Sequence, residues 1–419
     1  MSTSYLLEDI FVAGGLPSVT YVERTTDDVN RSFIKSISQP NSIVSLTGPT
    51  KSGKTVLCRT ILKDAPYIWV EGGQVSTEEA IWSKVCSILN FPITTTQSQR
   101  RQNSSSVETS IEGEGGIPLL GKLKAVFKVG GSQLSSNEMT RAYSIDTMLE
   151  ALRYMQENKV RLVIDDFHYL PQDVRISFLR SIKSAIFDGL KIVLISVTHR
   201  AFEAIRSEPE LTGRFIHVEI PEWNDSELLL IPKRGLETLN ATCDSKIIRS
   251  LISESHKSPL LVQKFFWELC FNSGIMAYTS TTQNIPVNSD IEAIFRSVAK
   301  DSGEPIYTRL AAGPQTRTAR QQRPLKNGGT ADIYQAIFLA VAATGPKVKI
   351  SYDELRGFLA NILANKPPQR LEVSNALKHL AKIASGISQG DKPIDWDEEA
   401  RILYIPDPFL RFFLRWRIK

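Results

Sequence analysis

The feature that most constrains this chain of 419 residues is the stretch at 43–62, IVSLTGPTKSGKTVLCRTIL. It contains the pattern G-x-x-x-x-G-K-[ST], from Gly48 to Thr55, between an apolar run typical of a strand and an apolar helical pattern. The two glycines allow the backbone to curl, so that its N–H groups point at an anion beside the positive end of the following helix. The pattern therefore predicts a site for a nucleoside triphosphate.

The residues of this loop are expected to hold ATP and Mg²⁺. Lys54 would reach the β- and γ-phosphates, and the Thr55 hydroxyl would be a ligand of Mg²⁺. The loop residues predicted to bind the nucleotide are Gly48, Pro49, Thr50, Lys51, Ser52, Gly53, Lys54, Thr55 and Val56.

Two neighbouring acids, Asp165 and Asp166, follow a short apolar run at 160–164. A nucleotide-hydrolysing site needs acids at a strand end opposite its phosphate loop. One carboxylate organises the water shell of Mg²⁺, and a second orients or deprotonates the attacking water. We predict Asp165 in the first role, as a metal site shared with Thr55, and Asp166 in the second.

Composition limits the classes of protein that fit. The length suggests two or three domains, and 50 Lys and Arg against 45 Asp and Glu leave only a mild positive charge. Any nucleic-acid contact should therefore be a local patch. Four well-separated cysteines without a C-x-x-C pair favour buried free thiols. With no run of 18 uncharged apolar residues and no signal-peptide pattern, we expect a cytoplasmic chain without a membrane span.

The order of motifs resembles the STAND and origin-recognition branch of AAA+ ATPases. The resemblance is carried by TYVER at 20–24, a helical pattern, the phosphate loop and the paired acids. It implies an α/β P-loop NTPase fold with an AAA+-like parallel sheet, a helical lid and a C-terminal winged helix. The expected domains are a nucleotide-binding domain at 1–221 with an insertion at 94–140, a lid at 222–298, a basic linker at 299–330 and a winged helix at 331–419.

The same resemblance assigns the base pocket. Tyr21, Val22 and Arg24 would line it, whereas the alternative is an edge strand with a solvated Arg24. Pro259 would open the helix nearest the base, as in the G-x-P element of STAND ATPases, although His256 stands where that pattern has glycine. The alternative for Pro259 is the first position of an ordinary helix.

Further catalytic residues follow by position. Thr198, at the end of a strand at 191–197, matches the sensor-1 position, with His199 as the alternative. Arg214 precedes the last core strand, where AAA+ proteins keep the arginine that reaches a neighbour's nucleotide; the alternative is a structural ion pair. Efficient AAA+ hydrolases usually carry Glu at the place of Asp166. The shorter side chain implies slow turnover, because small misplacement of the water is costly.

Three segments outside the nucleotide core bear on partners. The insertion at 94–140, rich in Ser, Thr, Gln and Gly, is expected to be partly disordered or a β-hairpin. The segment at 300–330 is a linker that either is solvated or lies along a phosphate backbone. Its basic residues are Arg309, Arg317, Arg320, Arg323 and Lys326. The apolar residues of the C-terminal tail are predicted as core: Phe409, Leu410, Phe412, Phe413 and Trp416.

Three functions remain open from the sequence. The first is a slow ATPase that acts as a nucleotide-controlled switch and forms homo-oligomers, with the resemblance implying anti-phage conflict and a separate effector protein. The second is an ATPase that binds duplex DNA through its winged helix and basic linker, in the manner of origin-recognition or transposition-regulator proteins. The third is a scaffold that binds nucleotide without hydrolysing it.

Overall fold

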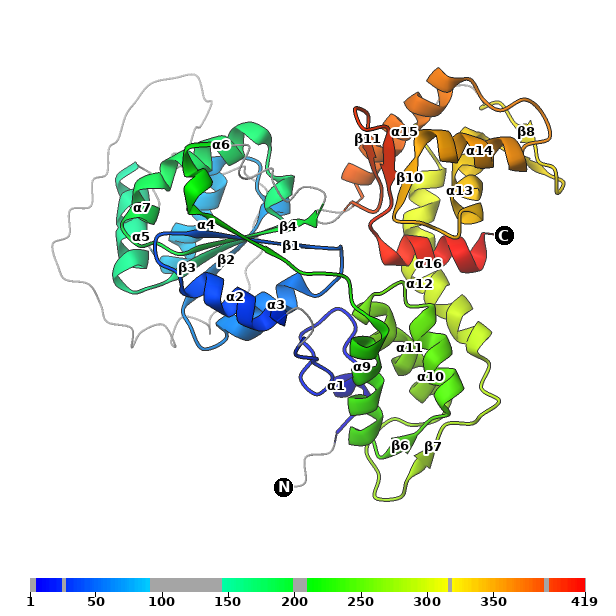
Figure 1. Cartoon of the computed structure of the whole chain (residues 1–419), viewed down its shortest axis with the longest axis horizontal. Coiled ribbons are helices and arrows are strands. Elements are labelled where there is room, and N and C mark those ends of the chain that lie inside the picture. The colour runs from blue at the N-terminus through cyan, green and yellow to red at the C-terminus, as the bar shows by residue number, and fades with distance from the viewer. Residues whose placement is uncertain are drawn as a thin grey trace, which may run out of the picture. The chain divides into compact units, whose positions relative to one another are not determined.

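In the computed structural model, the strand before the phosphate loop lies inside a five-stranded parallel sheet (Figure 1). Its strands are β1 (Ile43–Gly48), β2 (Tyr67–Glu71), β3 (Arg161–Asp165), β4 (Ile192–Val197) and β5 (Phe215–Glu219), in the order β2-β3-β4-β1-β5. Every residue of β1 and of β4 is buried, which explains their apolar character without alternation. Because the strands are parallel, their carboxyl ends, including those of β1 and β3, meet at one edge.

The structure describes residues 5–24, 28–90, 145–198, 209–315, 319–387 and 392–418. The insertion predicted at 94–140 and the alternative sensor His199 lie outside them. The described chain divides into a unit of residues 79–151 and a larger unit that holds the rest. The smaller unit contains most of α4 (Glu78–Leu89), whose buried face includes Trp82 and Val85, and the first half of α5 (Ile145–Glu157).

Helices cover both faces of the sheet in the larger unit. Figure 1 shows α2 (Val29–Ser38) and α3 (Lys54–Leu62) on one face, and α6 (Gln172–Ser181) and α7 (Lys183–Phe187) on the other. The sequence predicts one helix at 174–187, but the structure divides it at Ile182. Short 3-10 turns are η2 (Gly72–Gln74), η4 (Phe167–Tyr169) and η6 (Pro209–Arg214).

Helices also form the predicted lid region. They are α9 (Asp225–Thr238), α10 (Ser245–Ser253), α11 (Pro259–Asn272) and α12 (Ile291–Ala311), with α1 (Leu7–Ile10) and the short strands β6 (Ala241–Thr242) and β7 (Gln283–Asn284). The break that we expect at Pro232 is absent, since α9 continues through it with Pro232 buried. Gly235 explains part of this packing: a Cβ there would lie 2.3 Å from the ring of Phe11.

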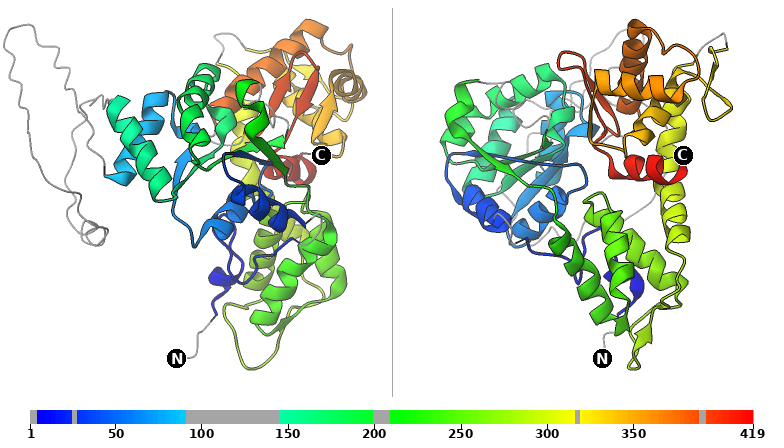
Figure 2. Two further views of the ribbon diagram at one scale, coloured as in Figure 1. Left: turned by 60° about the vertical axis from the view of Figure 1, so that its left-hand side comes forward. Right: turned by 45° about the vertical axis from the view of Figure 1, so that its right-hand side comes forward.

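The predicted start of the linker, at residue 299, is wrong, because α12 continues to Ala311. This helix is covered by α16 (Pro408–Arg417), which lies across it in both views of Figure 2. Gly303 permits the close approach: a Cβ there would be 2.3 Å from the Cβ of Phe413. Tertiary burial therefore keeps this stretch helical despite its Gly and Pro.

The C-terminal residues form helices and a small antiparallel sheet. The elements are β8 (Arg323–Pro324), β9 (Thr330–Ala331), α13 (Ile333–Ala343), β10 (Lys349–Ser351), α14 (Tyr352–Ile362), α15 (Arg370–Ser385), β11 (Asp395–Asp397) and β12 (Ile402–Tyr404). The sheet order is β10-β12-β11. The sequence predicts a hairpin at 393–405, and β11 and β12 pair there as antiparallel strands. Phe412 and Phe413 are buried, as expected of core residues, while the winged-helix assignment stays a prediction.

Candidate nucleotide-binding site

The loop between β1 and α3 has the curled backbone that an anion site needs. Lys51 and Gly53 both adopt left-handed φ, of 59° and 92°. Gly48 lies against Ile220, where a Cβ would approach the Cβ and the carbonyl oxygen of Ile220 to 3.0 Å. A loop that turns its N–H groups inward beside a helix start forms a concave anion site.

Polar groups of this loop fit a phosphate. The Thr50 and Ser52 hydroxyls are buried and have no hydrogen-bond partner among the described residues. The Lys54 ammonium is also buried, and it donates to the carbonyl oxygens of Gly48 (3.2 Å) and Pro49 (2.8 Å). Buried hydroxyls without partners are costly, so their presence here fits a ligand rich in acceptor oxygens.

The two predicted halves of the site meet at the sheet edge. The Thr55 hydroxyl donates to Asp165 Oδ2 at 2.9 Å, and Asp165 Oδ1 accepts the N–H of Asp166 at 3.0 Å. Asp165 is only 8% exposed, whereas Asp166 is half-buried and has a left-handed φ of 54°. Gly72 fits closely against this turn, because a Cβ there would lie 2.6 Å from the Asp166 carbonyl oxygen.

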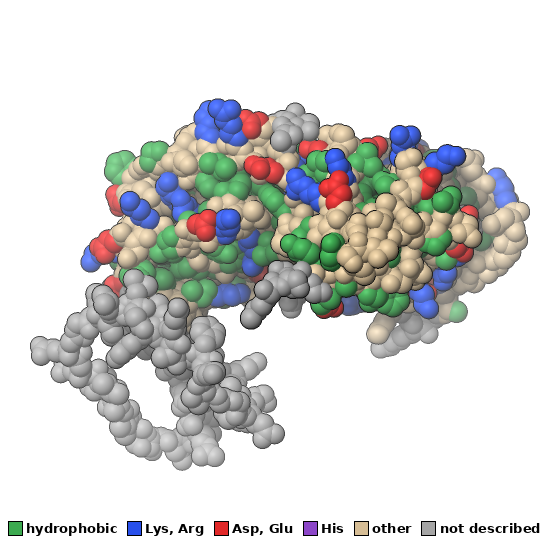
Figure 3. All heavy atoms as spheres, turned by 90° about the horizontal axis from the view of Figure 1, so that it is seen from below, with side chains coloured by type: hydrophobic (Ala, Val, Ile, Leu, Met, Phe, Trp, Pro, Cys, Tyr) green, Lys and Arg blue, Asp and Glu red, His purple; other side chains and the backbone are tan. Residues whose placement is uncertain are grey.

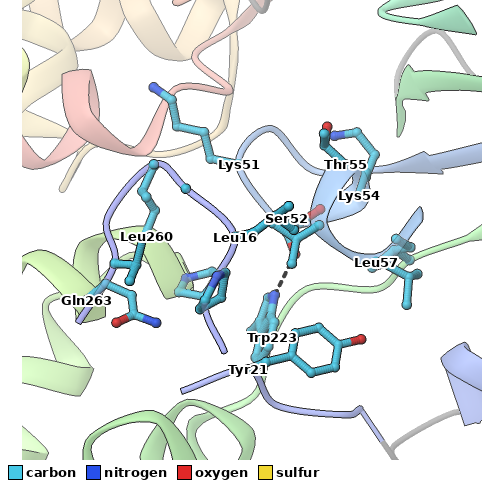
Figure 4. A pocket seen from close by; sticks show the side chains of 18 of the residues that line it. Leu16, Tyr21, Lys51, Ser52, Lys54, Thr55, Leu57, Trp223, Leu260 and Gln263 are labelled. Atoms are coloured by element: carbon cyan, nitrogen blue, oxygen red, sulfur yellow. Dashed lines mark hydrogen bonds between the residues drawn. The ribbon is translucent and has the colours of Figure 1, made fainter. Parts of the chain in front are cut away.

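A cavity of about 880 Å³ extends from the loop (Figure 4). Both acids are among the residues that line it. The loop contributes residues 51–56, so Val56 is included, whereas Gly48, Pro49 and Thr50 are not among the described lining residues. Away from the loop its walls come from the N-terminal segment, α9 and α11. They include Tyr21, Val22, Trp223, Pro259, Leu260 and Gln263. A cavity of this size and mixed lining suits a nucleotide.

Arg24 lines the cavity, but its guanidinium is engaged within the protein. It donates to both carboxylate oxygens of Glu227 (3.2 and 3.0 Å) and to the carbonyl oxygens of Pro221 (2.8 Å) and Glu222 (3.0 Å). It also lies 4.7 Å from the ring centre of Trp223. The alternative of a solvated arginine on an edge strand is therefore wrong, because Arg24 is 6% exposed and its segment is not a strand.

Pro259 occupies the first turn of α11, after the N-cap Ser258, and also lines the cavity. The residue that stands in place of a glycine, His256, has a left-handed φ of 48°. Burial, and then the charge of Arg411, lower the pKa of His256 to about 3. His256 is therefore neutral at physiological pH.

The other predicted catalytic residues lie at opposite ends of the sheet, and neither is among the described residues that line the cavity. Thr198 is exposed and directly follows β4, the strand between β1 and β3. Arg214 precedes β5, and Phe215 pairs with Ile43 at the start of β1. The length of β1, about 17 Å, thus separates Arg214 from its own phosphate loop. It stacks on Phe187, with 5.3 Å between its Cζ and the ring centre.

Sequence reasoning missed two contacts of the loop. The indole N–H of Trp223 donates to the Ser52 carbonyl oxygen at 2.8 Å, as Figure 4 shows. The Lys51 ammonium forms an ion pair with Asp407, the N-cap residue of α16, and lies 4.2 Å from the ring centre of Phe409. Asp before Pro marks a helix start in the sequence, but nothing local indicates its partner.

Burial also changes protonation beside the site. The pKa of the Cys58 thiol, on α3, is raised by burial and then by the charge of Asp165, so this thiol stays protonated. Burial raises the pKa of Tyr21, and it lowers the pKa of Lys264, which the Lys51 charge lowers further. Neither the thiol nor the phenol is therefore an ionised nucleophile at neutral pH.

No protein-family model matches this chain, and no curated protein matches it. Among solved structures, a Walker-type ATPase of Pyrococcus abyssi matches with a TM-score of 0.55 and 14% identity, over 95% of this chain and 100% of that one. The fold is that of an α/β P-loop NTPase. Two proteins of Aeropyrum pernix also match this chain. They are ORC2 in ADPNP–ADP complexes (TM-score 0.48, 13% identity, 99% and 98% covered) and ORC1 in complex with DNA (0.48, 11%, 99% and 97%).

The described residues lack two features that bear on function. They contain no group of three or more His, Cys, Asp or Glu that could hold a metal ion. In the same residues, no helix is long and apolar enough to cross a membrane. A magnesium ion at Thr55 and Asp165 would therefore need phosphate and water oxygens as further ligands, which is usual for Mg²⁺.

Proposed function

We propose that this protein binds ATP with Mg²⁺ and hydrolyses it slowly. The hydrogen bond from Thr55 to Asp165 carries the proposal, because it joins the phosphate loop to the acid pair across the sheet edge. The hydroxyls of Thr50 and Ser52, which have no hydrogen-bond partner in the described parts of the chain, support it from the loop side. Bound Mg²⁺ would neutralise charge on the phosphoryl oxygens.

Each residue then has a role that its position supports. Thr55 and Asp165 would hold the metal, and the Lys54 ammonium would exchange its two carbonyl acceptors for phosphate oxygens. Asp166 would orient the attacking water from the turn after β3, and Thr198 would contact that water or the γ-phosphate from the end of β4. Slow turnover follows from the short reach of Asp166, whose left-handed backbone also restricts how its side chain can be placed.

The test compares Asp166→Asn with Lys54→Ala. We expect Asp166→Asn to bind ATP with nearly normal affinity and to lose about a hundredfold in turnover, because only the orienting carboxylate is removed. Lys54→Ala should lose nucleotide binding itself. Phosphate release and equilibrium binding of a fluorescent ATP analogue measure the two effects. Unchanged turnover in Asp166→Asn would refute hydrolysis at this site and leave the nucleotide-stabilised scaffold.

We also infer that the nucleotide controls the C-terminal residues, as a switch requires. The ion pair between Lys51 and Asp407 supports this, because it ties the phosphate loop to the start of α16. Asp407 is 4% exposed at its side chain and lines the nucleotide cavity. A triphosphate would compete for the Lys51 ammonium and repel the Asp407 carboxylate, so binding should loosen α16 from the loop.

Asp407→Asn tests the switch with little damage to the helix. The Asp407 oxygen Oδ1 caps α16 by accepting the N–H groups of Phe409 (2.8 Å) and Leu410 (3.0 Å), and an asparagine oxygen can do the same. We expect tighter ATP binding, by roughly tenfold, because a charged pair that opposes the nucleotide is removed. Equal affinity in the variant and the wild type would contradict the coupling.

We propose self-association on the ground of the position of Arg214. It cannot reach the loop of its own chain, so any catalytic role requires a second copy. We expect the mass of the assembly in solution to increase when ATP is added. Arg214→Ala should turn over ATP more slowly than the wild type, but only at protein concentrations at which the wild type assembles. A wild type that stays monomeric at saturating ATP would refute this role. The anti-phage setting and the separate effector stay predictions.

Duplex DNA as a partner also stays a prediction. Two of the basic linker residues expected to contact it form ion pairs within the protein. Arg320 pairs with Asp332 at 3.0 Å, and Arg323 pairs with Glu372. Arg317 lies outside the described residues. On the face drawn in Figure 3, basic and acidic side chains are interspersed. DNA binding measured at two salt concentrations tests the point, since several phosphate contacts give a steep salt dependence.

A further inference from the structure

One buried amide in the cavity wall has a fixed orientation. Gln263, on α11, donates from Nε2 to the hydroxyl oxygen of Thr20 at 2.8 Å. That hydroxyl donates its single proton to the carbonyl oxygen of Ile10, also at 2.8 Å. Since Thr20 then has only acceptor capacity left, the amide cannot be reversed. Gln263 therefore turns its nitrogen to Thr20 and its oxygen elsewhere.

The oxygen of this amide has no donor within the part of the chain that the structure describes. Gln263 is 4% exposed, and its Oε1 is buried without a hydrogen-bond partner among the described residues. Thr20, at 2% exposed, is buried with it. A buried acceptor left unpaired destabilises a fold, so its retention calls for an explanation, and a ligand donor is one.

The position of Gln263 identifies the part of the ligand that it would meet. The phosphates belong at residues 51–55, while Gln263 lines the same cavity from α11. It lies one helical turn after Pro259 and next to Leu260, with which it appears in Figure 4. Tyr21 and Trp223 add aromatic walls to the cavity. Apolar and aromatic walls around one polar group are typical of a base pocket.

We propose that Gln263 selects the base of the nucleotide by accepting a hydrogen bond from the 6-amino group of adenine. This rests on the proposed function, and it adds the residue that distinguishes adenine from 6-oxo purines. One N–H of the amide donates to Thr20, and the buried atom of Gln263 left without a partner among the described residues is the acceptor Oε1. A 6-oxo group placed there would set two acceptor oxygens against each other. The incoming base has to shift the side chains that now cover Oε1.

Changing the ligand tests this without changing the protein. The wild type is titrated with ATP, with purine riboside triphosphate, which lacks the 6-amino group, and with inosine triphosphate, which carries a 6-oxo group. We expect ATP to bind roughly tenfold more tightly than purine riboside triphosphate, and inosine triphosphate to bind no better than the latter. Equal affinities for ATP and purine riboside triphosphate would overturn the proposal, as expected if buried water satisfies Gln263.

Two variants extend the test. Gln263→Met should bring the affinities for ATP and purine riboside triphosphate to within about twofold of each other, because no acceptor remains. Leu260→Met, a control in the same wall, should keep the tenfold preference. A preference unchanged in a folded Gln263→Met also overturns the proposal. If the wild type binds none of the three triphosphates, the proposed function itself fails, a result distinct from binding without preference.

Discussion

Removing the charge of Arg24 should cost more stability than removing it together with its partner. Arg24 and Glu227 are 6% and 4% exposed, and four hydrogen bonds hold the guanidinium to Glu227, Pro221 and Glu222. Arg24→Met leaves a buried carboxylate without its cation and two carbonyl groups without this donor. Breaking a buried pair in this way costs about 3–5 kcal/mol.

The matched control removes both charges. In Arg24→Met with Glu227→Leu, no buried charge is left, but Glu227 no longer accepts the N–H of Asn224 in the capping box. That loss costs about 1 kcal/mol, so the double variant should be more stable than the single one. Urea denaturation followed by tryptophan fluorescence measures both free energies of unfolding, with Trp223 beside the pair as a reporter. A single variant that loses less than about 1 kcal/mol, or a double variant that loses more than the single, would refute the reasoning.

Two further predictions concern packing and pH. Gly303→Ala should destabilise the protein by about 1–3 kcal/mol, because the new methyl group would lie 2.3 Å from the Cβ of Phe413. The control Gly357→Ala should be neutral or stabilising, because a Cβ there meets no atom within 4 Å. Thermal denaturation compares the two variants, and equal effects would contradict the close packing at Gly303. The pKa of His256 is lowered from 6.5 to about 3 by burial and then by Arg411, so between these values only the unfolded chain binds the proton. The free energy of unfolding should therefore fall as pH drops below about 6.5, by at most about 1.4 kcal/mol per pH unit. In His256→Asn the free energy of unfolding should fall less over this range, and asparagine tolerates the left-handed φ of this position. Identical pH profiles of the variant and the wild type would exclude this role of His256.

Much of the local structure could be predicted because its signals lie within a few residues. The phosphate loop, the strand that precedes it and the strand that precedes the acid pair are encoded by spacing and apolar runs. The start of α14 is encoded by Ser351, the N-cap residue that stands three residues before Glu354. The errors arose where packing overrides local preference. Pro232 is accommodated inside a buried helix, and α12 continues past residue 299 because α16 covers it.

The sequence by itself determined the phosphate loop, the acid pair and the strands that precede them, since periodicity and motif spacing are local properties of a chain. Only the tertiary structure decided which charges and hydrogen bonds meet. Lys51 and Asp407 are 356 positions apart, Gln263 and Thr20 are 243 apart, and Arg24 and Glu227 are 203 apart. A buried polar group takes the partner that the folded backbone brings within reach, and no spacing in the sequence encodes that choice.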